Sequence, residues 1–210
     1  SRPILCTQIA WGYMDISEVD ASESRLRDAE RCLEGPADEM VVVVEEQFHA
    51  LPARIAMVRT YNAQSVGDSP AALKYAKLAI KLAPEEDHFL RAQTNAILGG
   101  TYWANGDLDA ACKSMSDWIE NAQRAGNFMF AIASASGKAD ILTEQGYLHE
   151  ALKTYQQSLQ LASEHEAESQ RIIAHHHLGL ALLYHEMRED DSATQHFQKS
   201  MELGQQSVLR

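Results

Sequence analysis

The sequence predicts an all-α fold, a right-handed superhelical solenoid of about five helix pairs. Apolar residues recur at helical spacing, turn residues separate the helical stretches, and a small residue returns at a nearly constant interval. That residue is Ala72, Ala111, Ala151 and Ala193, at intervals of 39, 40 and 42 residues. A small residue lets two helices approach closely, and a helix pair buries its apolar stripe only against neighbouring pairs. A stack of helix pairs follows.

The clearest helix pair lies in the third repeat, whose middle reads LGGTYWANGDLDAA. Leu98 and Tyr102 share one helical stripe, and a second stripe begins after the break at residues 105–107. Gly106 suits the left-handed residue that ends a helix, and Asp107 suits the N-cap of the next helix. The sequence therefore predicts a helical hairpin at this point.

The first part of the chain is less regular. Residues 2–15 and 18–33 are expected to form a first helix pair, which Gly35 and Pro36 close. Residues 41–44 are four valines with strand propensity, but no partner strand is found, so a helix is favoured. Pro52 either starts a new helix in its first turn or kinks a longer one.

Four further pairs are expected over residues 53–83, 87–125, 127–161 and 169–204, with Gly204 ending the last helix. We therefore divide the chain into residues 1–36, a cap or linker, and residues 37–210, the helical repeats. Arg188 stands in the last turn, where the preceding pairs have a glycine.

Composition excludes several classes of protein. The chain has 30 acidic and 18 basic residues and a formal charge of −12, which repels phosphate backbones, so direct binding to nucleic acid is not expected. No apolar run is long enough to cross a bilayer, so no membrane association is expected. The three cysteines have no CxxC spacing and fit a reducing compartment, which predicts a cytoplasmic location.

The string LGGTYWANGDLDAA resembles a tetratricopeptide repeat. Its small, aromatic and turn positions are matched by Leu98, Gly99, Tyr102, Gly106 and Ala111. Three longer strings, LRAQTNAILGGTYWANGDLDAA, ILTEQGYLHEALKTYQQSLQLA and HHHLGLALLYHEMREDDSATQHFQKSMELG, resemble the sensor region of LuxR-type, MalT-like ATP-dependent bacterial transcription regulators. This second resemblance covers roughly residues 53–205.

The resemblance implies a regulatory sensor segment that binds a small-molecule effector or a regulatory protein on its concave face. It also implies an ATPase module and a helix-turn-helix module elsewhere in the parent chain, because this segment has no GxxxxGK[ST] and no basic recognition helix. DNA binding would belong to the helix-turn-helix module. The alternative is a free-standing tetratricopeptide scaffold for protein–protein interaction.

In tetratricopeptide solenoids the first helix of each pair lines the concave wall. Carrying this frame across predicts the ligand-binding residues Arg54, Tyr61, Gln93, Trp103, Asp140, Thr143, Glu144 and His185. The aromatic rings would stack on a sugar or another polar ring, and the polar side chains would bind its hydroxyls. The alternative is that Trp103 packs between repeats and that the charged residues are simply solvated.

No catalytic constellation or phosphate-binding loop is present, so we expect no enzymatic activity and no cofactor in this segment. The run from His175 to His177 does not predict a metal site, because neighbouring side chains on a helix point about 100° apart. The acidic residues at 85–87 and 190–191 stand at helix starts, where negative charge is favourable, so we interpret them as caps.

Overall fold

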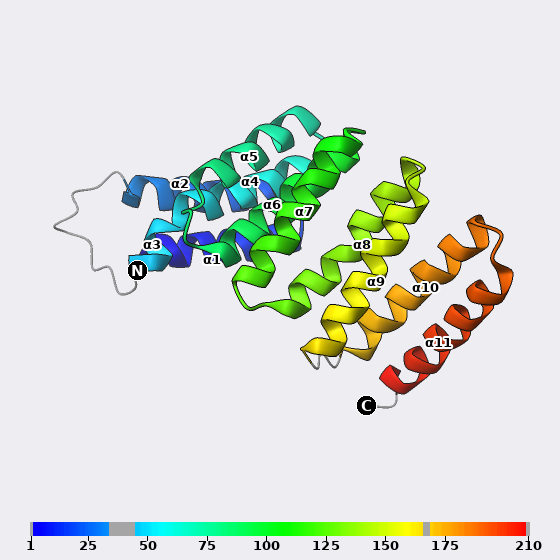
Figure 1. The fold of residues 1–210 in the computed structure, drawn as a ribbon. Coiled ribbons are helices and arrows are strands. Elements are labelled where there is room, and N and C mark those ends of the chain that lie inside the picture. Colours follow the sequence, from blue (N-terminus) through cyan, green and yellow to red (C-terminus); the bar gives the residue numbers. More distant parts are fainter. Residues whose placement is uncertain (1, 34–44, 166–168, 209–210) are drawn as a thin grey trace. The chain divides into compact units, whose positions relative to one another are not determined.

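The computed structural model describes residues 2–33, 45–165 and 169–208, and all regular structure in these ranges is α-helical (Figure 1). The all-α prediction is therefore confirmed. Contacts between residues divide the chain into two compact units, Ser1–Gly106 and Asp107–Arg210. We call them unit 1 and unit 2. This division lies in the turn of the third predicted pair, whereas the sequence analysis placed a boundary after residue 36.

Unit 1 consists of two packed helix pairs and two further helices. Its helices are α1 (Arg2–Asp15), α2 (Val19–Leu33), α3 (Glu45–His49), α4 (Leu51–Ser65), α5 (Ser69–Leu82) and α6 (His88–Ala104). Helix α1 pairs with α2 and α4 pairs with α5, as Figure 1 shows. Helix α4 also packs against α1, α2 and α6, so α4 is the centre of unit 1.

Small side chains let the helices of unit 1 approach closely. Ala72, Ala76 and Ala79 of α5 are at most 1% exposed, as the repeated alanine pattern predicts. Pro52 lies in the first turn of α4, which begins at Leu51, so the proline starts a new helix. The four valines at 41–44 lie outside the described residues.

A partly buried ionic cluster fixes the first helix pair to α4. The guanidinium of Arg59 on α4 donates from Nη1 to Oε1 of Glu30 (2.6 Å) and from Nη2 to Oε1 of Glu23 (2.8 Å). Both glutamates belong to α2. Because the Arg59 side chain is only 15% exposed, water competes little for these bonds. The first helix pair is therefore part of the packed body of unit 1.

Unit 2 continues the pattern of paired helices. Its helices are α7 (Leu108–Arg124), α8 (Phe128–Glu144), α9 (Leu148–Glu164), α10 (Gln170–Glu186) and α11 (Asp190–Val208). Helix α8 pairs with α9 and α10 pairs with α11, while α7 packs on α8 and α10 packs on α8 and α9. The expectation that Gly204 ends the last helix is wrong, because α11 continues to Val208. One glycine weakens a helix by only about 1 kcal/mol, which does not suffice to end it.

Caps and left-handed turn residues end and restart the helices where the sequence predicted them. Gly106 has a φ of +77°, a conformation open to glycine at no steric cost. The carboxylate of Asp107 accepts a hydrogen bond of 3.1 Å from the backbone N–H of Ala110 in the first turn of α7. The predicted roles of Gly106 and Asp107 are confirmed.

Arg188 occupies the corresponding turn between α10 and α11 with a φ of +64°. An L-residue with a Cβ is strained there, so replacing Arg188 by glycine is expected to stabilise unit 2 by about 1 kcal/mol. Urea unfolding measures this change. Arg188→Ala retains the Cβ and should give no such gain; an equal gain in both variants would assign the effect to the arginine side chain.

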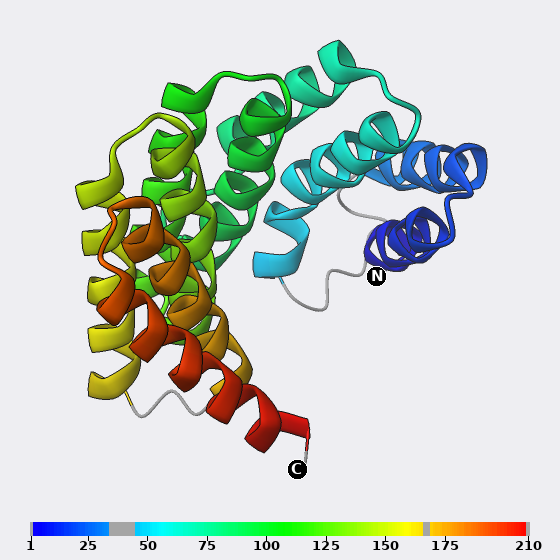
Figure 2. The same cartoon turned by 90° about the vertical axis from the view of Figure 1, so that its right-hand side faces the viewer.

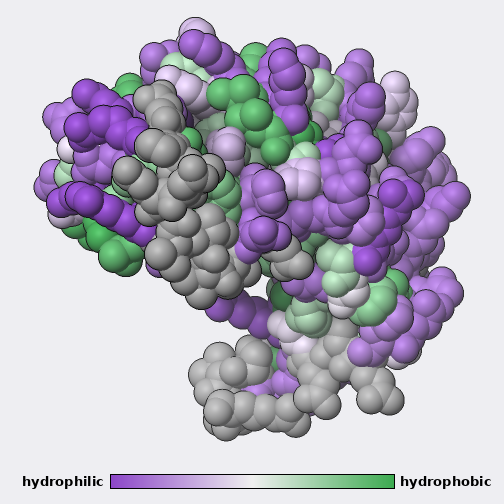
Figure 3. Space-filling model, turned by 90° about the vertical axis from the view of Figure 1, so that its left-hand side faces the viewer, coloured by the Kyte–Doolittle hydropathy of each residue, from purple (hydrophilic) through white to green (hydrophobic). Residues whose placement is uncertain are grey.

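One face of the protein is mainly polar (Figure 3). Figure 3 shows hydrophilic side chains over most of the face in view, with hydrophobic residues in small separate areas. Among the described residues, no helix combines the length and the apolar character that a bilayer crossing requires.

Candidate functional site

A cavity of about 380 Å³ lies within unit 1, where α1, α3, α4 and α6 meet. Three of these helices, α1, α4 and α6, each begin an expected helix pair. Figure 2 shows the ribbon of this region from the side. The residues lining the cavity are Ile4, Thr7, Gln8, Trp11, Gln47, Leu51, Arg54, Met57 and Gln93. The cavity has a size common for small-molecule sites.

Two of the predicted site residues, Arg54 and Gln93, line this same cavity from different helices. Arg54 lies on α4 with an exposed side chain, and Gln93 lies half-buried on α6. The residues on either side of them are buried, namely Ala53 and Ile55 for Arg54, and Ala92 and Thr94 for Gln93. Arg54 and Gln93 therefore lie on the side of their helices that faces away from the core. The structure thus brings together two side chains that are separated by 38 intervening residues in the sequence.

The aromatic ring at the cavity is Trp11 of α1, which the sequence analysis did not predict. Its ring packs edge-on against Tyr61 of α4, with ring centroids 5.4 Å apart and an angle of 82° between the ring planes. Tyr61 itself packs against the core of unit 1, and burial raises the pKa of its hydroxyl. Tyr61 therefore packs against the ring of Trp11 and is not one of the residues that line the cavity.

The polar side chains of the cavity are available for a ligand. Gln8, Gln47 and Gln93 make no side-chain hydrogen bond to another described residue, and Arg54 makes no ion pair with a described residue. The hydroxyl of Thr7, in contrast, donates to the carbonyl oxygen of Pro3 at 3.0 Å. Three amides and one guanidinium can therefore bind a guest without breaking a bond within the described protein.

The fourth predicted residue of unit 1, Trp103, lies in the last turn of α6. Its side chain is partly buried, and it does not belong to the lining of the cavity. A role of Trp103 in ligand binding stays a prediction.

In unit 2, the four predicted residues lie in different surroundings. Asp140 accepts a hydrogen bond of 3.3 Å from the hydroxyl of Tyr155. The hydroxyl of Thr143 donates a hydrogen bond of 2.8 Å to the backbone carbonyl oxygen of Ala139 in the same helix. Partial burial raises the pKa of Asp140, while the bond from Tyr155 opposes this shift. His185 lies 3.3 Å from Asp190, and Glu144 is exposed.

A second cavity, of about 390 Å³, lies between α8, α10 and α11 in unit 2. None of the four predicted residues Asp140, Thr143, Glu144 and His185 lines it; Arg171, His175 and Leu178 do. Neither of these two cavities is lined by any of the four predicted side chains, and their role in binding stays a prediction.

The histidine run of α10 separates into different environments, as helical geometry requires. His175 is exposed, His177 is partly buried, and His176 is 1% exposed. The ring of His176 contacts the carbonyl oxygen of Ile172 through Nδ1 (2.9 Å) and the hydroxyl of Ser158 through Nε2 (2.9 Å). Burial lowers the pKa of His176 to about 4, so this ring is a neutral structural group at pH 7.

Comparison with known protein families gives a match over most of the chain. The family profile described as the MalT-like TPR region matches residues 53–209. The HTH-type transcriptional regulator MalT of Serratia proteamaculans is 23% identical over 167 residues, and its counterpart in Yersinia pestis is 24% identical over 170 residues. Each alignment covers 80% of this chain but only 18% of the relative. The chain therefore corresponds to a small part of those proteins.

Solved structures show the same type of fold. A signal-transduction ATPase with numerous domains and a tetratricopeptide-repeat sensor, from Pyrococcus horikoshii, superposes with a TM-score of 0.77 at 15% identity, covering 96% of this chain and 29% of that one. The apo form of RapI has a TM-score of 0.76 at 14% identity, covering 99% of this chain and 72% of that one. At such low identity the likeness concerns the fold alone.

Proposed function

Because the chain belongs to the family of MalT-like tetratricopeptide regions, we propose that it is the sensor segment of a transcription activator, and that a small effector binds to its first helices. The relatives are named as HTH-type regulators, and one structural neighbour is a signal-transduction ATPase. We extend this organisation to the parent protein of the present chain. Effector binding would then be transmitted to ATPase and helix-turn-helix modules in the same polypeptide.

One observation carries this proposal, the cavity of unit 1 with Arg54 and Gln93 in its lining. Its walls come from α1, α3, α4 and α6, of which α4 and α6 are the first helices of expected repeat pairs. A ligand that contacts three helices at once is held by the packing of unit 1 and in turn restrains it. Such a ligand binds the folded state selectively, and selective binding is the physical requirement for a sensor.

A screen of the chain against sugars, organic acids and nucleotides by thermal shift and calorimetry tests the proposal. At a concentration of 100 times its Kd, a ligand should stabilise the folded chain by about 2.7 kcal/mol. Gln93→Ala removes one hydrogen-bonding group from the cavity, and the affinity for that ligand should fall about threefold to tenfold.

Gln195→Ala is the matched control, because Gln195 is an exposed glutamine of α11 outside the cavity of unit 1. This variant should bind like the original chain. Equal losses in both variants, or the absence of any ligand from the screen, would contradict the proposal.

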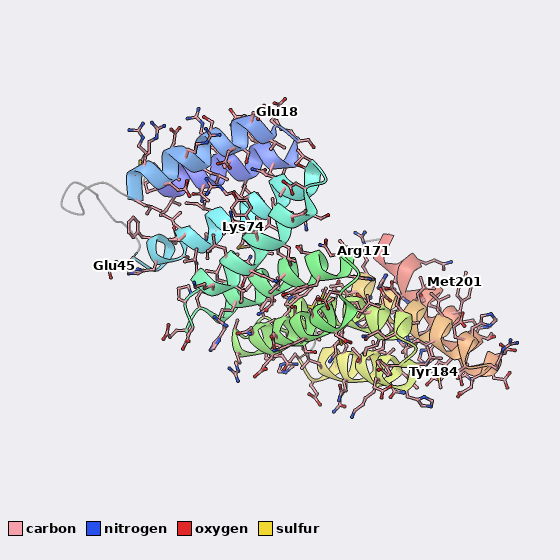
Figure 4. The ribbon with its side chains drawn as sticks, turned by 90° about the horizontal axis from the view of Figure 1, so that it is seen from above. Glu18, Glu45, Lys74, Arg171, Tyr184 and Met201 are labelled. Carbon is pink, nitrogen blue, oxygen red and sulfur yellow. The ribbon has the colours of Figure 1, made fainter. Side chains whose placement is uncertain are left out.

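A second candidate function is a scaffold for a protein segment. The last pair of unit 2 exposes large apolar side chains, with Leu182 of α10 61% exposed and Phe197 and Met201 of α11 50% and 51% exposed. Met201 is labelled in Figure 4, where its side chain points away from the helices. Phe197 and Met201 are four residues apart on α11 and therefore share one helix face, and an exposed apolar face of this kind favours a protein partner. A stoichiometric complex with a protein, with no metabolite stabilising the chain, would support this second function.

A further inference from the structure

The charge of the unit 1 cavity is opposite to that of the chain. Among the described residues that line the cavity, Arg54 is the one charged residue, and none is an aspartate or a glutamate. The chain as a whole carries 30 acidic residues against 18 basic ones. The cavity is therefore a positively charged site in an acidic protein, and it favours a negatively charged ligand.

The two arginines of α4 differ in their ion pairs. Arg59 is saturated by Glu23 and Glu30, which hold its guanidinium with four hydrogen bonds. Arg54 lies at the cavity, has an exposed side chain and makes no ion pair with a described residue. Its planar fork of N–H donors matches a carboxylate or a phosphate oxygen pair, which it binds through two parallel hydrogen bonds.

The remaining lining sets the shape of the guest. Trp11, Leu51 and Met57 offer an apolar wall, and Trp11 is held in place by its edge contact with Tyr61. Gln47 and Gln93 add neutral amides, whose N–H groups can complete the hydrogen bonding of an anion. A neutral sugar would find no carboxylate acceptor for its hydroxyls among the lining residues that the structure describes.

From this combination we propose that the guest of the cavity is a small organic anion, with its carboxylate or phosphate on Arg54 and a flat apolar body against Trp11. This inference rests on the proposed function, because it names the chemical class of the effector. It differs from the sugar or other polar ring ligand that the sequence suggested, since Tyr61, Trp103 and Asp140, which belonged to that expected site, do not line this cavity.

Calorimetry with matched probes tests the charge preference. Phenylacetate and its neutral amide, phenylacetamide, have the same shape and differ in charge, phenyl phosphate carries the second anionic group, and maltose is a neutral sugar. Phenylacetate or phenyl phosphate should bind at least about tenfold more tightly than phenylacetamide, since a charge-assisted hydrogen bond contributes more than a neutral one. The anion that binds with the higher affinity shows whether the cavity prefers a carboxylate or a phosphate. Added salt should weaken binding of the anions and leave binding of the amide unchanged.

Arg54→Gln should abolish the difference between phenylacetate and phenylacetamide, and Arg54→Lys should retain part of it. The Arg54 side chain is exposed, so the melting temperature of both variants should equal that of the original chain. Arg188→Gln is the matched control, because Arg188 is an exposed arginine in unit 2, outside this cavity, and this variant should bind all probes unchanged.

The outcomes separate the two proposals. Three results would overturn the anion inference: equal affinity for phenylacetate and phenylacetamide, a preference for the anion that persists in Arg54→Gln, or binding of maltose alone. Each of them would leave the proposed sensor function standing. If neither these probes nor the metabolite screen yields a ligand, both the inference and the proposed function are wrong.

Discussion

Replacing Gly179 by alanine is expected to lower the free energy of unfolding of unit 2 by about 3 kcal/mol, through overpacking of its core. Gly179 lies on α10, and a Cβ added there would be 2.3 Å from both Cζ and Oη of Tyr155 and 2.8 Å from its Cε2. Tyr155 is 2% exposed and belongs to the core of unit 2 with Leu180 and Leu183. Its hydroxyl also donates to Asp140, so a displaced ring would lose packing and this bond.

Urea unfolding followed by far-UV circular dichroism measures the loss. Gly100→Ala is the matched control, because Gly100 is also a glycine inside a helix but its added Cβ would meet nothing within 4 Å. That variant should gain up to about 1 kcal/mol from higher helix propensity. A loss below about 0.5 kcal/mol in Gly179→Ala would show that Tyr155 moves aside freely, and would contradict the tight packing of α9 against α10.

The periodic features of the sequence predicted the local structure well, because they depend on residues close in the chain. The turn at Gly106, the cap at Asp107 and the buried alanines of α5 all follow from local backbone chemistry or helical spacing. The course of α11 beyond Gly204 did not follow from the sequence, since one glycine costs a helix less than the rest of α11 contributes. Arg188 adopts the left-handed turn conformation that the sequence alone assigned to glycine.

The site was predictable only in part, for a physical reason. Spacing on one helix places Arg54 and Gln93 on the side that faces away from the core, and the structure finds both at one cavity. Spacing on one helix does not reveal which residue of another helix lies beside them. Trp11 was missed because α1 does not match the repeat pattern, and the bond from Tyr155 to Asp140 joins two different helices of unit 2. Such contacts between elements are decided by tertiary packing.

The second large effect is expected on acidification, when the stability of unit 2 should fall by about 2 kcal/mol between pH 7 and pH 5 because of His176. Burial lowers the pKa of His176 from its ordinary 6.5 to about 4, although the carbonyl oxygens of Ile172 and Ile132 near its two ring nitrogens favour the protonated form. The unfolded chain therefore binds a proton near pH 6.5, whereas the folded chain resists it until about pH 4. The contribution of neutral His176 is complete above pH 6.5 and is lost progressively as the pH falls from 6.5 towards 4.

His176→Gln tests the assignment, because glutamine retains polar atoms near Ser158 and Ile172 but does not titrate. Urea unfolding at pH 5, 6 and 7 should then show a flatter dependence of stability on pH in this variant. His175→Gln is the control, since His175 is the exposed neighbour on α10 and only a minor cause of the lowered pKa of His176, so its variant should keep most of the original slope. His177 and His196 titrate nearby, and burial lowers the pKa of each, so their contribution remains in both variants. If His176→Gln and the original chain lose stability in parallel on acidification, the effect belongs to these other histidines, and His176 is not the group that resists protonation.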